Sequence, residues 1–263
     1  MNNMKTALIL PGGGSKGAFE VGACKEIFKK FTPDLIIGTS VGALNGVVLA
    51  NGKDIKKNIK KIEKIWQNAS RKTFFPHNLK LFYKYHHAQS IYSHNGLLNQ
   101  LKQNITVKNF EELNIPLYVN CTNMNTGKSK MFKKGELIKP VLASCSLPPF
   151  FKPIYINKIP YLDGGISNYL GISNLKFKQI IVVNLFQKQN FEMKNNFGEY
   201  TSRMASLIMN QLIKDEIKLA QKAAKIINIA ATFKHIHLSD FNHTRELIKL
   251  GEKTAKKVLK NIK

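Results

Sequence analysis

A serine flanked by glycines lies where a reactive hydroxyl could be exposed. The motif Gly38-Thr39-Ser40-Val41-Gly42 stands between the apolar run 34–37 and the small-residue segment 41–50. A G-x-S-x-G between a strand and a helix is typical of a nucleophile elbow, a strained turn that projects the serine hydroxyl. The outer glycines leave space for the crossing backbone, and the following helix directs its positive end toward the reacting centre. The motif therefore predicts Ser40 as a nucleophile, and the alternative is a glycine turn with an incidental serine.

A glycine loop follows the first apolar run of the chain. Gly12, Gly13 and Gly14 precede Ser15-Lys16-Gly17, which formally matches the G-x-G-x-x-G turn of dinucleotide-binding folds. Those folds also need an acidic residue at the end of the second strand, but Asp34 lies before the second apolar run. A P-loop is excluded because Ala18 follows Gly17. Backbone N–H groups that converge at a helix N-terminus can instead form an oxyanion hole or a phosphate cradle.

A nucleophilic serine needs a base, and the sequence leaves two options. The first is one of seven histidines, in the order Ser…Asp…His with Asp163: His77, His86, His87, His94, His235, His237 and His243. The second is Asp163 acting directly, since Gly164 and Gly165 keep its surroundings open. By itself, an Asp-Gly-Gly segment is also typical of an ordinary turn.

Taken together, these motifs resemble the patatin-like phospholipase family. The glycine loop, the G-x-S-x-G, the small-residue and proline–aromatic segment 143–153 and the Asp-Gly-Gly occur in the family's order. The resemblance runs from about Thr6 to Asn168, and less specifically through the apolar run 180–186. It implies an α/β fold and a lipid acyl hydrolase with a serine–aspartate dyad.

The resemblance also implies roles for single residues. Ser40 is the nucleophile, Asp163 is the general base, and the Gly13 and Gly14 N–H groups, next to Gly12, form the oxyanion hole. Lys16 occupies the basic position of the loop, where it holds the loop or meets a substrate phosphate; a solvated lysine is the alternative. The chain departs from the family's Asn-x-Pro element after the Asp-Gly-Gly, which leaves the role of Asn168 open.

Apolar runs and helical periodicity predict strands that alternate with helices. Strands are expected at 5–10, 34–37, within 117–132 around the turn 125–127, at 180–186 and at 235–239. Helices are expected at 18–30, 41–50, 55–66, 200–227 and 247–262. This alternation predicts a mostly parallel central sheet with helices on both faces, in a single domain over residues 1–263.

The chain is strongly basic. It has 41 Lys and Arg against 16 Asp and Glu, a formal charge of +25, which favours anionic partners. Only three of the basic residues are arginine, so biased genome composition is an alternative cause. The helices 55–66 and 247–262 are basic and amphipathic, and segment 71–87 mixes rings with lysines. Each fits a membrane surface, with ordinary inward packing as the alternative.

The resemblance implies a phospholipid or lysophospholipid substrate and peripheral contact with an anionic membrane; nucleic acid is not an expected partner. Cys24, Cys121 and Cys145 form no CxxC pair, and the histidines at 77, 86 and 87 lack ligand partners, so no metal and no cofactor is expected. With no signal peptide or transmembrane run, we expect a cytoplasmic or peripheral membrane location.

Two other functions stay open at this point. One is a Ser-His-Asp esterase of small esters, which would depend on a histidine. The other is a catalytically silent basic protein that binds membranes or nucleic acid, with an unreactive Ser40. The sequence does not determine an oligomeric state.

Overall fold

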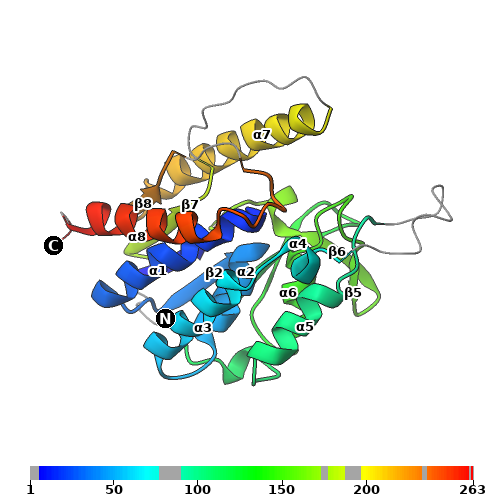
Figure 1. The fold of residues 1–263 in the computed structure, drawn as a ribbon, viewed down its shortest axis with the longest axis horizontal. Helices are drawn as coiled ribbons and strands as arrows, with labels where there is room; N and C mark the ends of the chain where they lie inside the picture. Colours follow the sequence, from blue (N-terminus) through cyan, green and yellow to red (C-terminus); the bar gives the residue numbers. More distant parts are fainter. Residues whose placement is uncertain are drawn as a thin grey trace.

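A mixed sheet runs through the centre of the computed structural model (Figure 1), which describes residues 6–76, 90–172, 177–186, 197–232, 236–260 and 262. The strand order is β5-β6-β3-β2-β1-β7-β8, and β4 pairs with β3 off this path. The strands are β1 (Thr6–Leu10), β2 (Leu35–Thr39), β3 (Leu117–Asn123), β4 (Ser129–Phe132), β5 (Ile154–Ile156), β6 (Ile159–Asp163), β7 (Gln179–Asn184) and β8 (Lys225–Ala230).

The strands β3, β2, β1, β7 and β8 are parallel to one another, whereas β4, β5 and β6 join antiparallel. Leu8 of β1 pairs with Ile36 of β2 and with Ile181 of β7, and all three side chains are buried. Apolar residues run through these strands without alternation because both faces of the sheet are covered. The predicted mostly parallel sheet is confirmed.

Helices connect and cover the strands. They are α1 (Gly17–Lys30), α2 (Val41–Ala50), α3 (Ile55–Gln67), α4 (Arg71–Phe74), α5 (Asn95–Asn104), α6 (Ile138–Ser144), α7 (Phe197–Ala220) and α8 (Thr244–Lys260), with the 3-10 turns η1 (Gly14–Lys16), η3 (Phe110–Glu112) and η4 (Gly164–Ile166). Parallel crossovers are right-handed, and the steps β1–β2 and β7–β8 move in opposite directions across the sheet. The helices α1 and α7 that make these steps therefore lie on opposite faces.

Helix α8 returns the end of the chain to α1, and two glycines allow the close approach. A Cβ on Gly22 of α1 would stand 1.9 Å from the Ile248 carbonyl oxygen. A Cβ on Gly251 of α8 would stand 2.1 Å from the Phe19 carbonyl oxygen. Backbone contact at this distance joins α1 and α8 into one layer, in which α8 also contacts β8.

At the end of the chain, one predicted helix is present but shorter than expected, and one predicted strand is wrong. The predicted helix 200–227 ends at Ala220, and residues 225–227 belong to β8, the last strand. The predicted strand 235–239 is not formed: residues 236–239 make a loop, and His235 lies outside the described residues. The segment Lys225–Ala230 is rich in isoleucine, a β-branched residue that favours strands, and it pairs with β7. Sheet pairing therefore decides its conformation.

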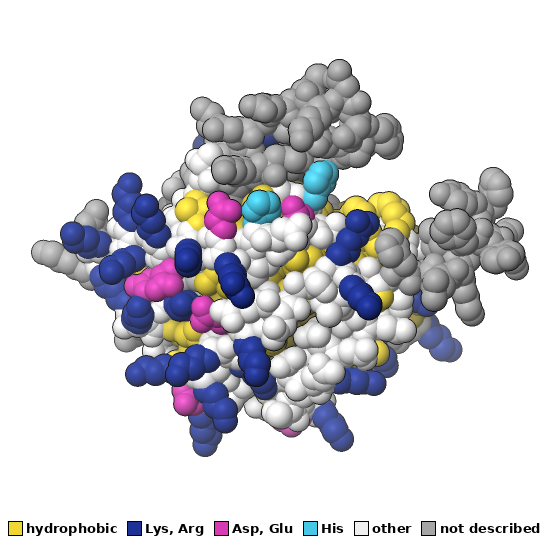
Figure 2. All heavy atoms as spheres, in the orientation of Figure 1, with side chains coloured by type: hydrophobic (Ala, Val, Ile, Leu, Met, Phe, Trp, Pro, Cys, Tyr) yellow, Lys and Arg dark blue, Asp and Glu magenta, His cyan; other side chains and the backbone are white. Residues whose placement is uncertain are grey.

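The basic amphipathic helices use their apolar faces inside the protein. Ile62 and Trp66 of α3 are buried, as are Leu247 and Leu259 of α8. Their interpretation as membrane-surface helices is therefore wrong, and the alternative of ordinary outer helices is confirmed. Lysines and arginines spread over the visible face of the molecule, with fewer acidic side chains between them (Figure 2).

The aromatic segment 71–87 is described only as far as residue 76. Phe74 is buried and stacks on Trp66 with ring centroids 6.0 Å apart. Phe75 is partly buried and meets Tyr92 edge-on at 5.2 Å. These two rings pack inward rather than toward a membrane, while the predicted roles of Phe82, Tyr83 and Tyr85 lie outside the described residues.

Candidate active site

The predicted site residues meet at the carboxyl ends of the strands. Thr39 of β2 pairs with Asn120 of β3, and the next β3 residue, Cys121, pairs with Asp163 of β6. Ser40 is one residue beyond Thr39, so it reaches the level at which Asp163 ends its own strand. The glycine loop follows β1, the strand next to β2. Strand register alone therefore brings the serine, the carboxylate and the loop together, at the edge where open α/β sheets bind ligands.

Ser40 occupies a strained elbow between β2 and α2. Its φ of 55° and ψ of −124° lie outside the regions that side chains favour. The flanking glycines are required by space, because a Cβ on Gly42 would stand 1.8 Å from the Leu10 carbonyl oxygen. A Cβ on Gly38 would stand 2.6 Å from the Cα of Ala43. The strand–turn–helix context expected for the G-x-S-x-G motif is present.

Asp163 is a buried carboxyl group, only 4% exposed, at the end of β6. Its Oδ1 accepts the Gly165 N–H at 2.9 Å. Burial raises the pKa of Asp163 to about 6, while side-chain hydrogen bonding with Ser40 and the Gly165 N–H act in the lowering direction. A carboxyl group with a pKa near neutrality that interacts with a serine hydroxyl can accept that hydroxyl's proton.

The glycine loop lies directly beside the elbow. A Cβ on Gly12 would be 3.0 Å from the Ser40 Cβ, and one on Gly13 would be 2.7 Å from Leu185 Cδ1. Gly14 has a φ of 56°, and a Cβ there would stand 2.3 Å from the Leu238 carbonyl oxygen. The loop thus needs glycine both for its shape and for the backbone that surrounds it.

The C-terminal loop 236–243 holds the glycine loop in place. The Ser15 N–H donates to the Leu238 carbonyl at 2.7 Å, and the Ser15 hydroxyl donates to the His237 carbonyl at 2.8 Å. Within the part of the chain that the structure describes, no hydrogen-bond acceptor engages the Gly13 or Gly14 N–H groups. N–H groups without a protein acceptor are the kind of donor that an oxyanion hole requires.

Lys16 is buried rather than solvated. The residue is only 2% exposed, and its Nζ lies 4.5 Å from the centroid of the Phe186 ring. Burial lowers the pKa of Lys16 to about 8. The alternative of a solvated lysine is wrong, and the cation–π contact ties the glycine loop to the end of β7.

Several residues that support Ser40 carry no motif of their own in the sequence. The Ser144 hydroxyl at the end of α6 accepts the Ser40 N–H at 2.8 Å and donates to the Asn120 carbonyl at 2.6 Å. The Cys145 thiol contacts the Ser40 carbonyl at 3.2 Å. The segment 143–153 contributes to the family resemblance, but only the fold shows that its first residues hold the elbow.

A second set of supporting contacts leads to α7. The Tyr169 hydroxyl donates to the Gly12 carbonyl. Glu216 of α7 accepts the N–H of Tyr169 at 2.7 Å and that of Leu170 at 3.0 Å. Asn168, whose role was open, accepts the Gly171 N–H at 3.0 Å through Oδ1 and shapes this turn. No sequence signal links Glu216 to a site some fifty residues earlier, because only folding brings α7 against the loop.

Within the described ranges, no histidine contacts Ser40 or Asp163. His94 Nε2 instead lies 2.9 Å from the Ser146 hydroxyl, and burial lowers the pKa of His94 to about 4. His243 interacts with Glu246 at 3.2 Å, and the His237 carbonyl accepts from Ser15. The candidates His77, His86, His87 and His235 lie outside the described residues. Over the same ranges, no group of three or more His, Cys, Asp or Glu could hold a metal ion.

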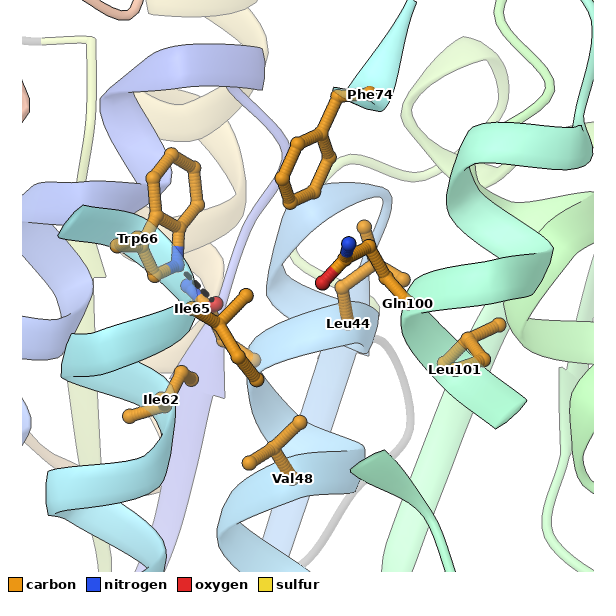
Figure 3. Close-up of a pocket in the computed structure, with 9 residues that line it drawn as sticks. Leu44, Val48, Ile62, Ile65, Trp66, Phe74, Gln100 and Leu101 are labelled. Carbon is orange, nitrogen blue, oxygen red and sulfur yellow. Dashed lines mark hydrogen bonds between the residues drawn. The ribbon is translucent and has the colours of Figure 1, made fainter. Parts of the chain in front are cut away.

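A small apolar cavity of about 30 Å³ lies between α2, α3 and α5. In Figure 3, Ile62, Ile65 and Trp66 of α3 face Leu44 and Val48 of α2 across it. It has room for about one water molecule and is too small for an acyl chain. This cavity is a packing feature rather than a substrate site.

A nucleophile elbow, a glycine loop and a buried carboxyl group at one end of a mostly parallel sheet are typical of α/β acyl hydrolases. The family model described as Patatin-like phospholipase matches residues 8–175, more than half of the chain. The chain therefore belongs to the patatin-like phospholipase family, and the resemblance drawn from its motifs is confirmed.

Curated relatives are about a quarter identical to this chain over the aligned residues. "Neuropathy target esterase sws" of Drosophila melanogaster is 26% identical over 198 residues, 73% of this chain and 14% of that protein. "Lysophospholipase NTE1" of Candida albicans is 26% identical over 196 residues, 70% of this chain and 13% of that protein. The chain thus spans only about one seventh of the length of these relatives.

Among solved structures, VipD from Legionella pneumophila matches with a TM-score of 0.48 and 15% identity, over 98% of this chain and 67% of that one. The type III effector ExoU matches with a TM-score of 0.43 and 13% identity, over 98% and 53%. None of the helices in the described part of the chain is both long and apolar enough to span a membrane.

Proposed function

We propose that this protein is a lipid acyl hydrolase that cleaves carboxylic esters of phospholipids or lysophospholipids with a Ser40–Asp163 dyad. The observation that carries the proposal is the buried Asp163 carboxyl group, whose pKa burial raises to about 6, at the same level of the sheet as a serine on a strained elbow. Membership of the patatin-like phospholipase family supports the same chemistry.

In the first half of the reaction, Ser40 Oγ attacks the ester carbonyl carbon while its proton passes to the Asp163 carboxylate. The developing oxyanion accepts hydrogen bonds from the Gly13 and Gly14 N–H groups, each worth about 3–4 kcal/mol in a comparable serine hydrolase. The tetrahedral intermediate then collapses, and the leaving alcohol takes the proton from Asp163. The acyl group remains on Ser40 as an ester.

In the second half, water attacks the acyl-enzyme and gives its proton to Asp163. Collapse of the second tetrahedral intermediate releases the carboxylic acid and returns the proton to Ser40 Oγ. No metal or organic cofactor enters this scheme. Lys16 acts as a positioning residue, because its ammonium group lies over Phe186 and fastens the glycine loop between Ser40 and β7.

Labelling with a lipophilic fluorophosphonate tests the dyad on the wild type, Ser40→Ala and Asp163→Asn, with the adduct site read by mass spectrometry. We expect one adduct on Ser40 in the wild type and none in either variant. We expect both variants to keep the fold, and circular dichroism checks this. The control variants are His94→Ala, His237→Ala and His243→Ala, which should label like the wild type.

Substantial labelling of Asp163→Asn together with its loss in a histidine variant would replace the dyad by a Ser-His-Asp esterase. No adduct on folded protein, with or without phospholipid vesicles, would favour the catalytically silent basic membrane- or nucleic-acid-binding protein. For its location, we propose a cytoplasmic protein that makes peripheral contact with an anionic membrane.

A further inference from the structure

Exposed large apolar side chains gather on one helix. Six of them lie on α7 and are 37–60% exposed: Tyr200, Met204, Leu207, Ile208, Leu212 and Leu219. Elsewhere in the described chain only Met124, Tyr155 and Ile166 are exposed in this way, and Met124 and Tyr155 both flank Pro160 of β6. Positions 200, 204, 208 and 212 are about one helical turn apart, so these side chains form a stripe, and Asp215 separates it from Leu219.

The opposite side of α7 packs against the protein. Ser206 and Ile213 are buried, and Met209, Ile217 and Ala220 lie against the core. The stripe is therefore the outward face of a helix that is already anchored. Figure 1 shows α7 at the upper margin of the molecule, beyond α8. An exposed apolar stripe of this size marks an interaction surface rather than chance exposure.

Charge decides between the occupants of this surface. Lys214 and Lys218 are exposed on α7 beside the stripe, and one exposed acidic residue, Asp215, lies at its end. The whole chain carries a formal charge of +25, so the cationic character prevails. A second copy would carry the same charge and be repelled, whereas an anionic bilayer would be attracted. An amphipathic helix with lysines at the border of its apolar face binds in the plane of such a bilayer.

We propose that the outward face of α7 is the surface with which this protein docks on an anionic lipid bilayer. The proposal rests on the proposed function, since the bilayer would hold the substrate. Glu216, on the inward side of the same helix, accepts the Tyr169 N–H, and the Tyr169 hydroxyl donates to the Gly12 carbonyl of the glycine loop. Docking through α7 thus places the bilayer against an element directly tied to the active site.

The test measures vesicle flotation in a Ser40→Ala background, so that no lipid is hydrolysed. The vesicles hold equal parts of phosphatidylcholine and phosphatidylglycerol. We expect Leu207→Glu/Ile208→Glu to weaken binding at least about tenfold, because two charges enter the apolar face. The matched control Met124→Glu/Tyr155→Glu adds the same charge at exposed apolar residues away from α7. It should bind vesicles much more tightly than the Leu207→Glu/Ile208→Glu variant.

A probe on α7 gives a second measurement. Cys24, Cys121 and Cys145 are buried, so a Leu207→Cys variant can be labelled at one site with an environment-sensitive fluorophore. Its emission should shift to the blue when vesicles are added. Labelling at Tyr155→Cys should give no such shift, since that residue lies on the edge strand β5.

Equal binding by the two double variants, or an unshifted probe on α7, would overturn the proposal. A wild-type dimer that becomes a monomer in the Leu207→Glu/Ile208→Glu variant would also overturn it, because the stripe would then join copies of this chain. In the active protein, the α7 pair should still hydrolyse a soluble short-chain ester at the wild-type rate. Loss of ester hydrolysis and Ser40 labelling with intact vesicle binding would instead reject the proposed function.

Discussion

At the scale of single residues, burial sets the properties of the candidate base. Asp163 lies in the interior with the Ser40 hydroxyl and the Gly165 N–H as its polar neighbours. A carboxylate in water would be too weak a base at neutral pH to take a serine proton well. Removing water from around it raises the proton affinity, so the position of one carboxyl group supplies the activation that a histidine gives in a triad.

The first prediction concerns the pH dependence of turnover. The reaction needs the ionised form of Asp163, whose pKa burial raises to about 6. We expect kcat/KM on a soluble ester to rise with pH and to reach half of its plateau near pH 6. A carboxyl group with an ordinary pKa would place the midpoint near about 4. A profile that is flat or falls between about pH 5 and 7 would contradict this role.

The same group makes stability depend on pH. Its folded pKa exceeds its unfolded pKa, so between the two values the folded state binds more protons than the unfolded state. Stability therefore falls as pH rises through this window and stays lower above about 6. Asp163→Asn removes this loss of stability. The Tm of the variant minus the Tm of the wild type should therefore increase as the pH is raised through the window. A constant Tm difference would show that Asp163 has no raised pKa.

Ser144 gives a third residue-level prediction. Its hydroxyl accepts the Ser40 N–H and donates to the Asn120 carbonyl, so it fixes the elbow without touching substrate. We expect Ser144→Ala to lower kcat by about ten- to a hundredfold with little change in KM, because loss of one buried hydrogen bond costs about 1–3 kcal/mol. Cys145→Ser, which keeps a donor for the Ser40 carbonyl, is the control. An effect on KM alone would rule out a positioning role.

At the scale of elements, one polar link joins three helices beside the site. The Asn45 amide of α2 donates to Glu20 of α1 at 2.7 Å and accepts from Trp66 Nε1 of α3 at 2.9 Å. Burial raises the pKa of Glu20 well above its usual range, which favours a protonated side chain here. Because α2 begins at the nucleophile, this link orients the helix that carries Ser40.

Asn45→Ala tests the link. The substitution leaves Trp66 Nε1 and the Glu20 carboxyl group buried without their partner, so we expect the free energy of unfolding to fall by about 2–4 kcal/mol. Gln100→Ala, at a residue that lines the neighbouring cavity, is the control and should cost less. Denaturant unfolding measures both. Equal losses would mean that the cavity, and not the polar link, governs stability there.

At the scale of the whole molecule, the two ends of the chain depend on each other. The first strand, β1, lies between β2 and the late strand β7, and α8 packs on α1. The C-terminal loop 236–243 also holds the glycine loop at the start of the chain. We therefore propose that residues 1–263 form one domain, which should unfold in a single cooperative transition.

The net charge of +25 gives the last prediction. Salt shortens the Debye length from about 10 Å at 0.1 M to about 3 Å at 1 M, so attraction to an anionic vesicle should weaken. We expect affinity for phosphatidylglycerol vesicles to fall at least about tenfold over this range, since several lysines contribute. Flotation at each salt concentration measures it. An unchanged affinity would attribute the lysine excess to genome composition rather than to a partner.

The local sequence was sufficient for features that depend on neighbours in the chain. The G-x-S-x-G and glycine loop could be interpreted because each is a short turn whose glycines are required by close backbone contacts. The helix 41–50 and the paired strands around 125–127 also agree with prediction. Such elements are set by turn residues and by runs of apolar side chains, which a linear pattern contains.

Tertiary structure decided everything that depends on what a face packs against. The strongly amphipathic helices α3 and α8 turn their apolar sides inward, whereas the less regular α7 leaves an apolar stripe outside. Ser144 and Glu216 became part of the site because β3, α6 and α7 fold around it. A sequence states which residues are apolar or polar, but only the arrangement of distant elements determines which of them find a partner.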